Sequence, residues 1–102
     1  MPQKIVVYWR DIPSQIIIKK GRAKGKAVLS QRFQEAIDRA AMRAGMADTD
    51  SYVEQWRRET ADYETEGDIQ TVAEAVAQEY EVQYNDDVLS AMVRNKGLTA
   101  EA

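Results

Sequence analysis

Residues 4–20 decide the fold: they read Lys-Ile-Val-Val-Tyr-Trp (4–9), Arg-Asp-Ile-Pro-Ser (10–14) and Gln-Ile-Ile-Ile-Lys-Lys (15–20). The two outer segments are rich in β-branched and aromatic residues, which is typical of strands. The segment between them is too short for a parallel crossover, which needs about a dozen residues. The sequence therefore predicts an antiparallel hairpin, with Pro13 fixing the backbone of its turn.

Apolar residues at helical spacing predict two long helices after the hairpin. The first is expected over residues 30–45 with Ser30 at its N-cap, and the second over 68–84 with Asp68 as its cap. A short C-terminal helix is expected to stop near Gly97. The two long helices are predicted to cover one face of the hairpin, because an isolated hairpin is marginally stable in water.

Two other segments are less regular. Residues 21–27 mix glycine with lysine and arginine and are interpreted as an exposed loop. Residues 52–60 fit either a helix or a third strand, and we favour a helical turn that passes into a strand near 55–60. The expected fold is α+β: an N-terminal antiparallel β-hairpin of two or three strands, packed against two longer helices and a short C-terminal helix. The alternative is a hairpin followed by four helices. One domain is expected over 1–97, with 98–102 as a frayed tail.

The composition excludes several classes of function. The chain has 102 residues and contains neither Cys nor His, so disulfides, thiolate metal sites and the usual catalytic triads are excluded. No serine has a histidine to activate it, and the acidic clusters do not match a calcium-binding loop, so neither an enzyme nor a metal or cofactor site is predicted. No apolar run approaches the ~20 residues of a membrane span, and no cleavage-site pattern follows the N-terminus. We expect a cytoplasmic domain that does not bind membranes.

The charge is divided unequally along the chain. Residues 1–45 carry ten lysines and arginines against three acids, a net +7, whereas residues 46–102 carry four against fourteen, a net −10. The two halves either attract each other within the fold or steer a charged partner. The overall pI of about 5.0 disfavours nucleic acid as that partner.

The hairpin tip is the first candidate site. Trp9, Arg10 and Asp11 lie beside Pro13, and tryptophan and arginine are favoured anchors of protein interfaces. They are therefore candidate partner-binding residues. The competing interpretation is structural: Trp9 packs under a helix, Arg10 pairs with an acid from the second half, and Asp11 bonds the amides of the turn.

A run of cations is the second candidate site. Five cations occur within eight residues, and they are candidates for anion binding: Lys19, Lys20, Arg22, Lys24 and Lys26. The run lacks the glycine–lysine–serine spacing of a phosphate-binding loop and lacks aromatic residues for base stacking. A solvated loop is the competing interpretation.

Three segments together resemble a known family. The sequence at 4–13, containing Trp-Arg-Asp-Ile-Pro, together with 32–42 and 52–58, is similar to the small bacterial "virulence factor" domain family, over about residues 3–95. The resemblance carries over no catalytic residues. It implies an accessory interaction module that docks on a larger bacterial protein, with a one-carbon methyl-transfer enzyme as one candidate. The alternative is a small-ligand or phosphate-binding domain that contributes to an enzyme completed by another chain.

Overall fold

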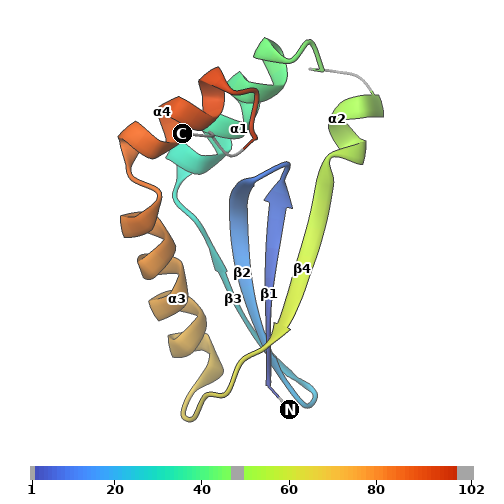
Figure 1. Ribbon diagram of the computed structural model, residues 1–102. Coiled ribbons are helices and arrows are strands. Elements are labelled where there is room, and N and C mark those ends of the chain that lie inside the picture. The colour runs from blue at the N-terminus through green and yellow to red at the C-terminus, as the bar shows by residue number, and fades with distance from the viewer. Residues whose placement is uncertain (1, 47–49, 99–102) are drawn as a thin grey trace.

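The computed structural model describes residues 2–46 and 50–98 and has the α+β fold expected. A four-stranded antiparallel sheet is accompanied by four helices (Figure 1). In chain order the elements are β1 (Gln3–Trp9), β2 (Ile12–Lys20), β3 (Ala23–Val28), α1 (Gln31–Arg43), α2 (Asp50–Glu54), β4 (Trp56–Asp62), α3 (Ile69–Gln83) and α4 (Asp86–Arg94). Of the expected tail, only Leu98 is described, and residues 99–102 lie outside the described part.

The sheet has the strand order β3-β2-β1-β4, so the predicted hairpin forms its centre. β1 pairs with β2 on one side and with β4 on the other, and both pairings are antiparallel. The interpretation of residues 52–60 is confirmed, because α2 ends at Glu54 and β4 begins at Trp56. The sheet is nevertheless larger than the two or three strands expected.

The extra strand is β3, where a loop over 21–27 was predicted, and that prediction is wrong. Ala23, Gly25 and Ala27 alternate with Lys24 and Lys26. A pattern of small and charged residues carries little hydrophobic signal, although an edge strand tolerates it well. The loop is reduced to Gly21 and Arg22, the turn between β2 and β3.

The turn of the central hairpin is shorter than predicted. Only Arg10 and Asp11 connect β1 to β2, and Arg10 has a left-handed φ of 54°. Pro13 lies inside β2, opposite Tyr8 and next to a register shift in the strand pairing. Strands accept proline at such irregularities because the ladder bond is already interrupted there.

The predicted long helices are confirmed, and their caps explain where they start. Asp68 accepts a hydrogen bond from the Thr71 N–H (3.0 Å), and Asn85 caps α4 through the Val88 N–H (3.0 Å). Ser30 is the N-cap of α1, but its side chain caps no backbone N–H of that helix. Its hydroxyl donates to Glu81 instead, and this bond ties the start of α1 to α3.

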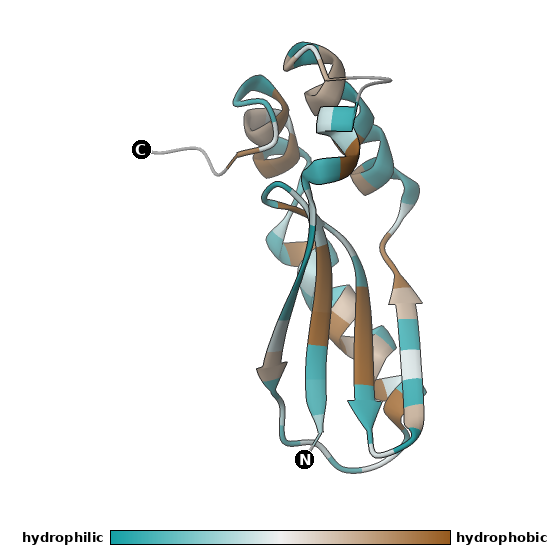
Figure 2. Cartoon of the chain, turned by 90° about the vertical axis from the view of Figure 1, so that its right-hand side faces the viewer, coloured by the Kyte–Doolittle hydropathy of each residue, from teal (hydrophilic) through white to brown (hydrophobic). Residues whose placement is uncertain are grey.

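The helices bury one face of the sheet and one of its ends. α3 lies along β2 and β3, whereas α1 and α4 pack together beyond the hairpin tip (Figure 1). Gly25 lies against the Ile69 backbone of α3, so Gly25 and the buried Ile18 opposite it belong to the covered face. None of the four described helices covers the main part of the other face (Figure 2). Among the described residues, no helix combines the length and the apolar character needed to cross a membrane.

Candidate binding surfaces

Trp9, at the end of β1, is part of the core. Its side chain is 0% exposed, and its indole Nε1–H donates to the backbone oxygen of Tyr52 (2.9 Å). Gly97 lies against the ring, since a Cβ at that position would be 2.7 Å from the indole. The structure therefore places Trp9 under α1, α2 and the end of α4, where its side chain is not presented to a partner.

Arg10 connects three segments that are distant in sequence. Its guanidinium donates to the Gln55 side-chain oxygen (3.2 Å), the Lys96 backbone oxygen (3.0 Å) and the Met46 sulfur (3.2 Å). The Arg10 backbone N–H also donates to the Gln55 backbone oxygen (3.0 Å). These contacts join the hairpin tip to the end of α1, the start of β4 and the end of α4.

Asp11 completes the tip. Its N–H donates to the Gly97 backbone oxygen (2.9 Å), and its carboxylate lies 3.3 Å from the Arg57 guanidinium. Arg57 also pairs with Glu59 (2.8 Å). Partial desolvation lowers the pKa of Arg57, but these two carboxylates outweigh it and raise the pKa above its ordinary value.

We expect Arg10→Ala to lower the free energy of unfolding by about 1.5–3 kcal/mol, the range for hydrogen bonds made by a charged group. Arg10→Lys should recover little of this loss, because one ammonium cannot reach three acceptors in different directions. Urea unfolding of both variants measures the effect. An alanine variant as stable as the parent would show that the three contacts do not hold these segments together.

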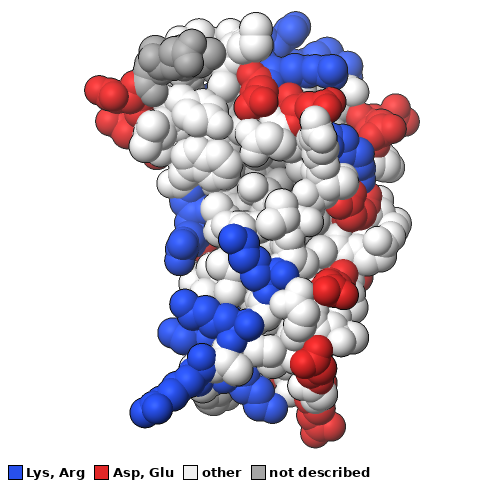
Figure 3. Space-filling model, turned by 180° about the vertical axis from the view of Figure 1, so that it is seen from behind, with Lys and Arg blue, Asp and Glu red and all other residues white. Residues whose placement is uncertain are grey.

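The predicted anion-binding residues lie at the opposite end of the sheet from the tip. Lys19 is directly opposite Lys24, and Lys26 is opposite Ile17. Opposite residues of an antiparallel pair share a face, so these three lysines lie on the uncovered face. Lys20 is paired with Ala23 on the other face, and Arg22 is in the turn. Figure 3 shows lysine and arginine gathered at this end of the molecule. The structure does not bring the tip and the basic run together.

The uncovered face has an apolar centre that the sequence analysis did not single out. Ile5 lies opposite Ile17, and Val7 lies opposite Gln15. All four are half-buried although none of the described helices covers them, and Val28 at the edge is 68% exposed. The alternation of side chains along β1 and β2 already indicated that these apolar residues share a face. That lysines border them follows only from the register of β2 with β3. We call Ile5, Val7, Ile17, Lys19, Lys24 and Lys26 the basic sheet face.

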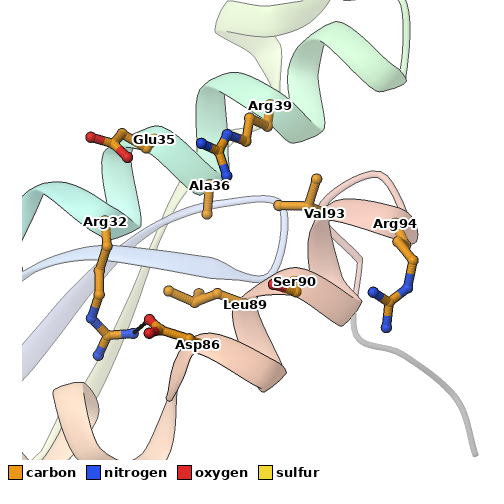
Figure 4. A pocket seen from close by; sticks show the side chains of 9 residues that line it. All are labelled: Arg32, Glu35, Ala36, Arg39, Asp86, Leu89, Ser90, Val93 and Arg94. Atoms are coloured by element: carbon orange, nitrogen blue, oxygen red, sulfur yellow. Dashed lines mark hydrogen bonds and ion pairs between the residues drawn. The ribbon is translucent and has the colours of Figure 1, made fainter.

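A groove of about 410 Å³ runs along the surface where α1 and α4 meet (Figure 4). Ala36, Leu89 and Val93 line it, and Arg32, Arg39 and Arg94 stand around it. In Figure 4, Arg32 reaches Asp86, the Arg39 guanidinium lies beside Ala36, and Glu35 points away from α4. Arg39 and Arg94 form no hydrogen bond or ion pair with the rest of the described chain. The sequence analysis missed this site, whose signal was the seven-residue spacing of Arg32 and Arg39 on α1.

Among the described hydrogen bonds from a hydroxyl to a carboxylate, the one between Ser30 and Glu81 is the shortest. The Ser30 hydroxyl donates to Glu81 (2.8 Å), as do the Ser30 N–H (2.6 Å) and the Arg32 guanidinium (3.0 Å). Burial raises the pKa of Glu81, but these hydrogen bonds outweigh it and lower the pKa below its usual value. A carboxylate held in this way is a poor general base, so the cluster ties α1 to α3 rather than activating a nucleophile.

A smaller groove of about 200 Å³ lies between the covered face and α3 and includes Lys4, Tyr8 and Tyr80. The Lys4 ammonium is 5.5 Å from the ring centre of Tyr63 and 5.7 Å from that of Tyr80. Burial, and then the neighbouring Tyr80, raise the pKa of Tyr8, so this phenol stays protonated at neutral pH. The described residues contain no cluster of side chains suited to hold a metal ion.

The comparison with known families identifies the chain. A family model described as "Virulence factor" matches residues 7–93, which is most of the chain and includes the last three residues of β1, the tip, the other three strands and nearly all of α4. The chain therefore belongs to the virulence factor family, as the resemblance of its sequence indicated. No curated protein and no solved structure matches it significantly.

Proposed function

We propose that this member of the virulence factor family is a non-enzymatic accessory module that docks on a larger protein through the basic sheet face. The observation that supports the proposal is that no helix within residues 2–46 and 50–98 covers the main part of this face, which combines an isoleucine and valine centre with lysines on one side. The resemblance suggests a one-carbon methyl-transfer enzyme as a candidate partner. The proposal also places the protein in the cytoplasm, a location that requires no disulfide, and the chain has no cysteine to form one.

The chemistry of the face suggests the kind of surface it binds. Ile5, Val7 and Ile17 offer apolar area that a partner would remove from water. Lys19, Lys24 and Lys26 are exposed beside that area and would steer an acidic partner towards it. We therefore expect the partner to present apolar residues bordered by aspartate or glutamate.

The hairpin tip is a secondary part of the proposal. Arg10 and Asp11 are half-buried, so each retains some surface for a partner, whereas Trp9 can only support them from the core. Their internal contacts give the tip a defined shape, which reduces the conformational freedom lost on binding. The partner-binding role of these three residues stays a prediction.

The groove between α1 and α4 supports a second candidate function. Arg39 and Arg94 lie beside an apolar floor and have no internal partner within the described residues. Arginine suits carboxylate and phosphate groups because its planar guanidinium can bind two oxygens at once. A small organic anion is the ligand that this groove would take, either alone or as part of a site completed by another chain.

One affinity experiment separates the two candidates. The parent protein, K24E/K26E and R39E/R94E are each immobilised and exposed to native lysate, and bound proteins are quantified by mass spectrometry. Both double variants make the same change in net charge, so non-specific electrostatic effects are matched. We expect one stoichiometric partner to bind the parent and R39E/R94E, and to be lost at least tenfold from K24E/K26E. Thermal melting confirms that both variants are folded.

Other outcomes would contradict the docking proposal. Loss of the partner from R39E/R94E alone would assign binding to the groove. Equal retention by both variants would remove the basic sheet face from the interface. Binding of inorganic phosphate by the parent but not by R39E/R94E, measured by NMR titration, would favour the small-anion function.

A further inference from the structure

The two edges of the sheet differ in how their backbone is occupied. At the β3 edge, the Gln70 side chain of α3 accepts from the Lys26 N–H (3.0 Å) and donates to the Lys26 backbone oxygen (2.8 Å). This amide occupies both backbone groups that an added strand would use there. The middle of the β3 edge is thereby blocked by the protein's own helix, which is one way in which proteins protect an exposed edge.

The β4 edge is open. The Tyr63 N–H donates to the Pro2 oxygen, and the Arg10 N–H to the Gln55 oxygen. Bonded pairs alternate along an antiparallel ladder, so Arg57, Glu59 and Ala61 direct their backbone groups towards β1. The N–H and C=O groups of Arg58, Thr60 and Asp62 point outwards, where the described chain offers them no partner. No other described helix or strand lies beyond β4 in Figure 1.

The charges on this edge are self-complementary. When two antiparallel copies of β4 meet about a two-fold axis at Thr60, Arg58 of each copy lies opposite Asp62 of the other. Thr60 then lies opposite its own symmetry mate. Arg58 and Asp62 are exposed, and neither forms an ion pair within the described residues. Opposite charges facing each other across strands stabilise the pair, and like charges destabilise it.

We propose that a second copy of this chain pairs with the β4 edge in this register. The outward backbone groups of Arg58, Thr60 and Asp62 bond their symmetry mates, and the two sheets become one continuous sheet of eight strands. Two registers nearer the start of β4 are less favourable, because centring the pairing on Arg58 would place two arginines opposite each other, and centring it on Glu59 two glutamates. The pairing leaves the basic sheet face uncovered, so it is independent of the proposed docking.

The test is a charge swap followed by sedimentation. Wild type, R58D, D62R and R58D/D62R are compared across a dilution series by analytical ultracentrifugation. Each single variant places two pairs of like charges in the dimer, and the double variant restores both attractions in reverse. We expect a wild-type dimer, at least a tenfold weaker dimer for each single variant, and recovery in the double variant. R22D makes the same charge change in the β2–β3 turn and should dimerise as wild type does.

Hydrogen exchange gives a second readout that does not depend on any substitution. The outward amides of Arg58, Thr60 and Asp62 should gain protection as the protein concentration rises, whereas other exposed amides should not. A wild-type protein that remains monomeric at its highest soluble concentration would overturn the proposal. A dimer whose affinity is unchanged in all the variants would also overturn it. So would a double variant that dimerises no more tightly than the single variants.

Discussion

Trp9→Ala is expected to remove about 3–5 kcal/mol from the free energy of unfolding, the usual cost of truncating a buried aromatic residue. The whole stability of a small domain is only about 5–15 kcal/mol, so this variant should lose a large share of it. The indole has no exposed surface and lies between Gly97, just after α4, and Tyr52 of α2. Its removal leaves a cavity where three segments meet, and Arg10 loses the ring against which it lies, at 5.5 Å.

A matched control is available because the chain contains a second tryptophan. Trp56 lies directly opposite Trp9 in the β1–β4 pairing but is only half-buried. Trp56→Ala should therefore cost distinctly less than Trp9→Ala in urea unfolding followed by circular dichroism. The cost of Trp9→Phe should lie between the costs of these two alanine variants, since phenylalanine keeps much of the volume but loses the hydrogen bond to the Tyr52 backbone. Equal costs for Trp9→Ala and Trp56→Ala would show that Trp9 is not central to the core.

The elements predicted correctly from sequence are those whose own periodicity is strong. β1 and β2 consist largely of β-branched and aromatic residues, and α1 shows apolar residues on one side and a glycine just after its end. Local preference and tertiary burial agree in these segments, so the pattern alone identifies them. In β3 the local preference for a strand is weak, because its sequence is Ala-Lys-Gly-Lys-Ala-Val. The strand is stabilised by pairing with β2 and by contact with α3, and neither can be recognised from that sequence.

The candidate sites were predicted less well than the fold, for a related reason. Trp9, Arg10 and Asp11 are adjacent in sequence, which suggested a presented loop. The tip is instead surrounded by residues 46, 52, 55 and 96–97, and no local pattern reports that these segments converge. The cations between Lys19 and Lys26 were found, but their distribution over two faces and a turn depends on the register of β2 with β3.

Gly25 is the position where the helix layer and the sheet come closest. A Cβ at this residue would lie 2.5 Å from the Ile69 backbone oxygen, 2.7 Å from its carbonyl carbon and 2.8 Å from the Gln70 nitrogen. All three are backbone atoms at the first turn of α3, so no side-chain rotation can relieve the overlap. Glycine is therefore needed here for close approach of two backbones.

We expect Gly25→Ala to cost about 3 kcal/mol, the upper end of the usual range for overpacked cores, because α3 must move away from β3. That movement should also separate Gln70 from Lys26 and free the backbone groups that close the β3 edge. The variant should then show both a lower urea midpoint and faster exchange of the Lys26 amide. Gly21→Ala is the control: its φ of 60° strains alanine by about 1–2 kcal/mol, but its Cβ would meet open space. If Gly25→Ala costs no more than Gly21→Ala and leaves the Lys26 amide protected, then the contact with Ile69 does not set the distance between α3 and the sheet.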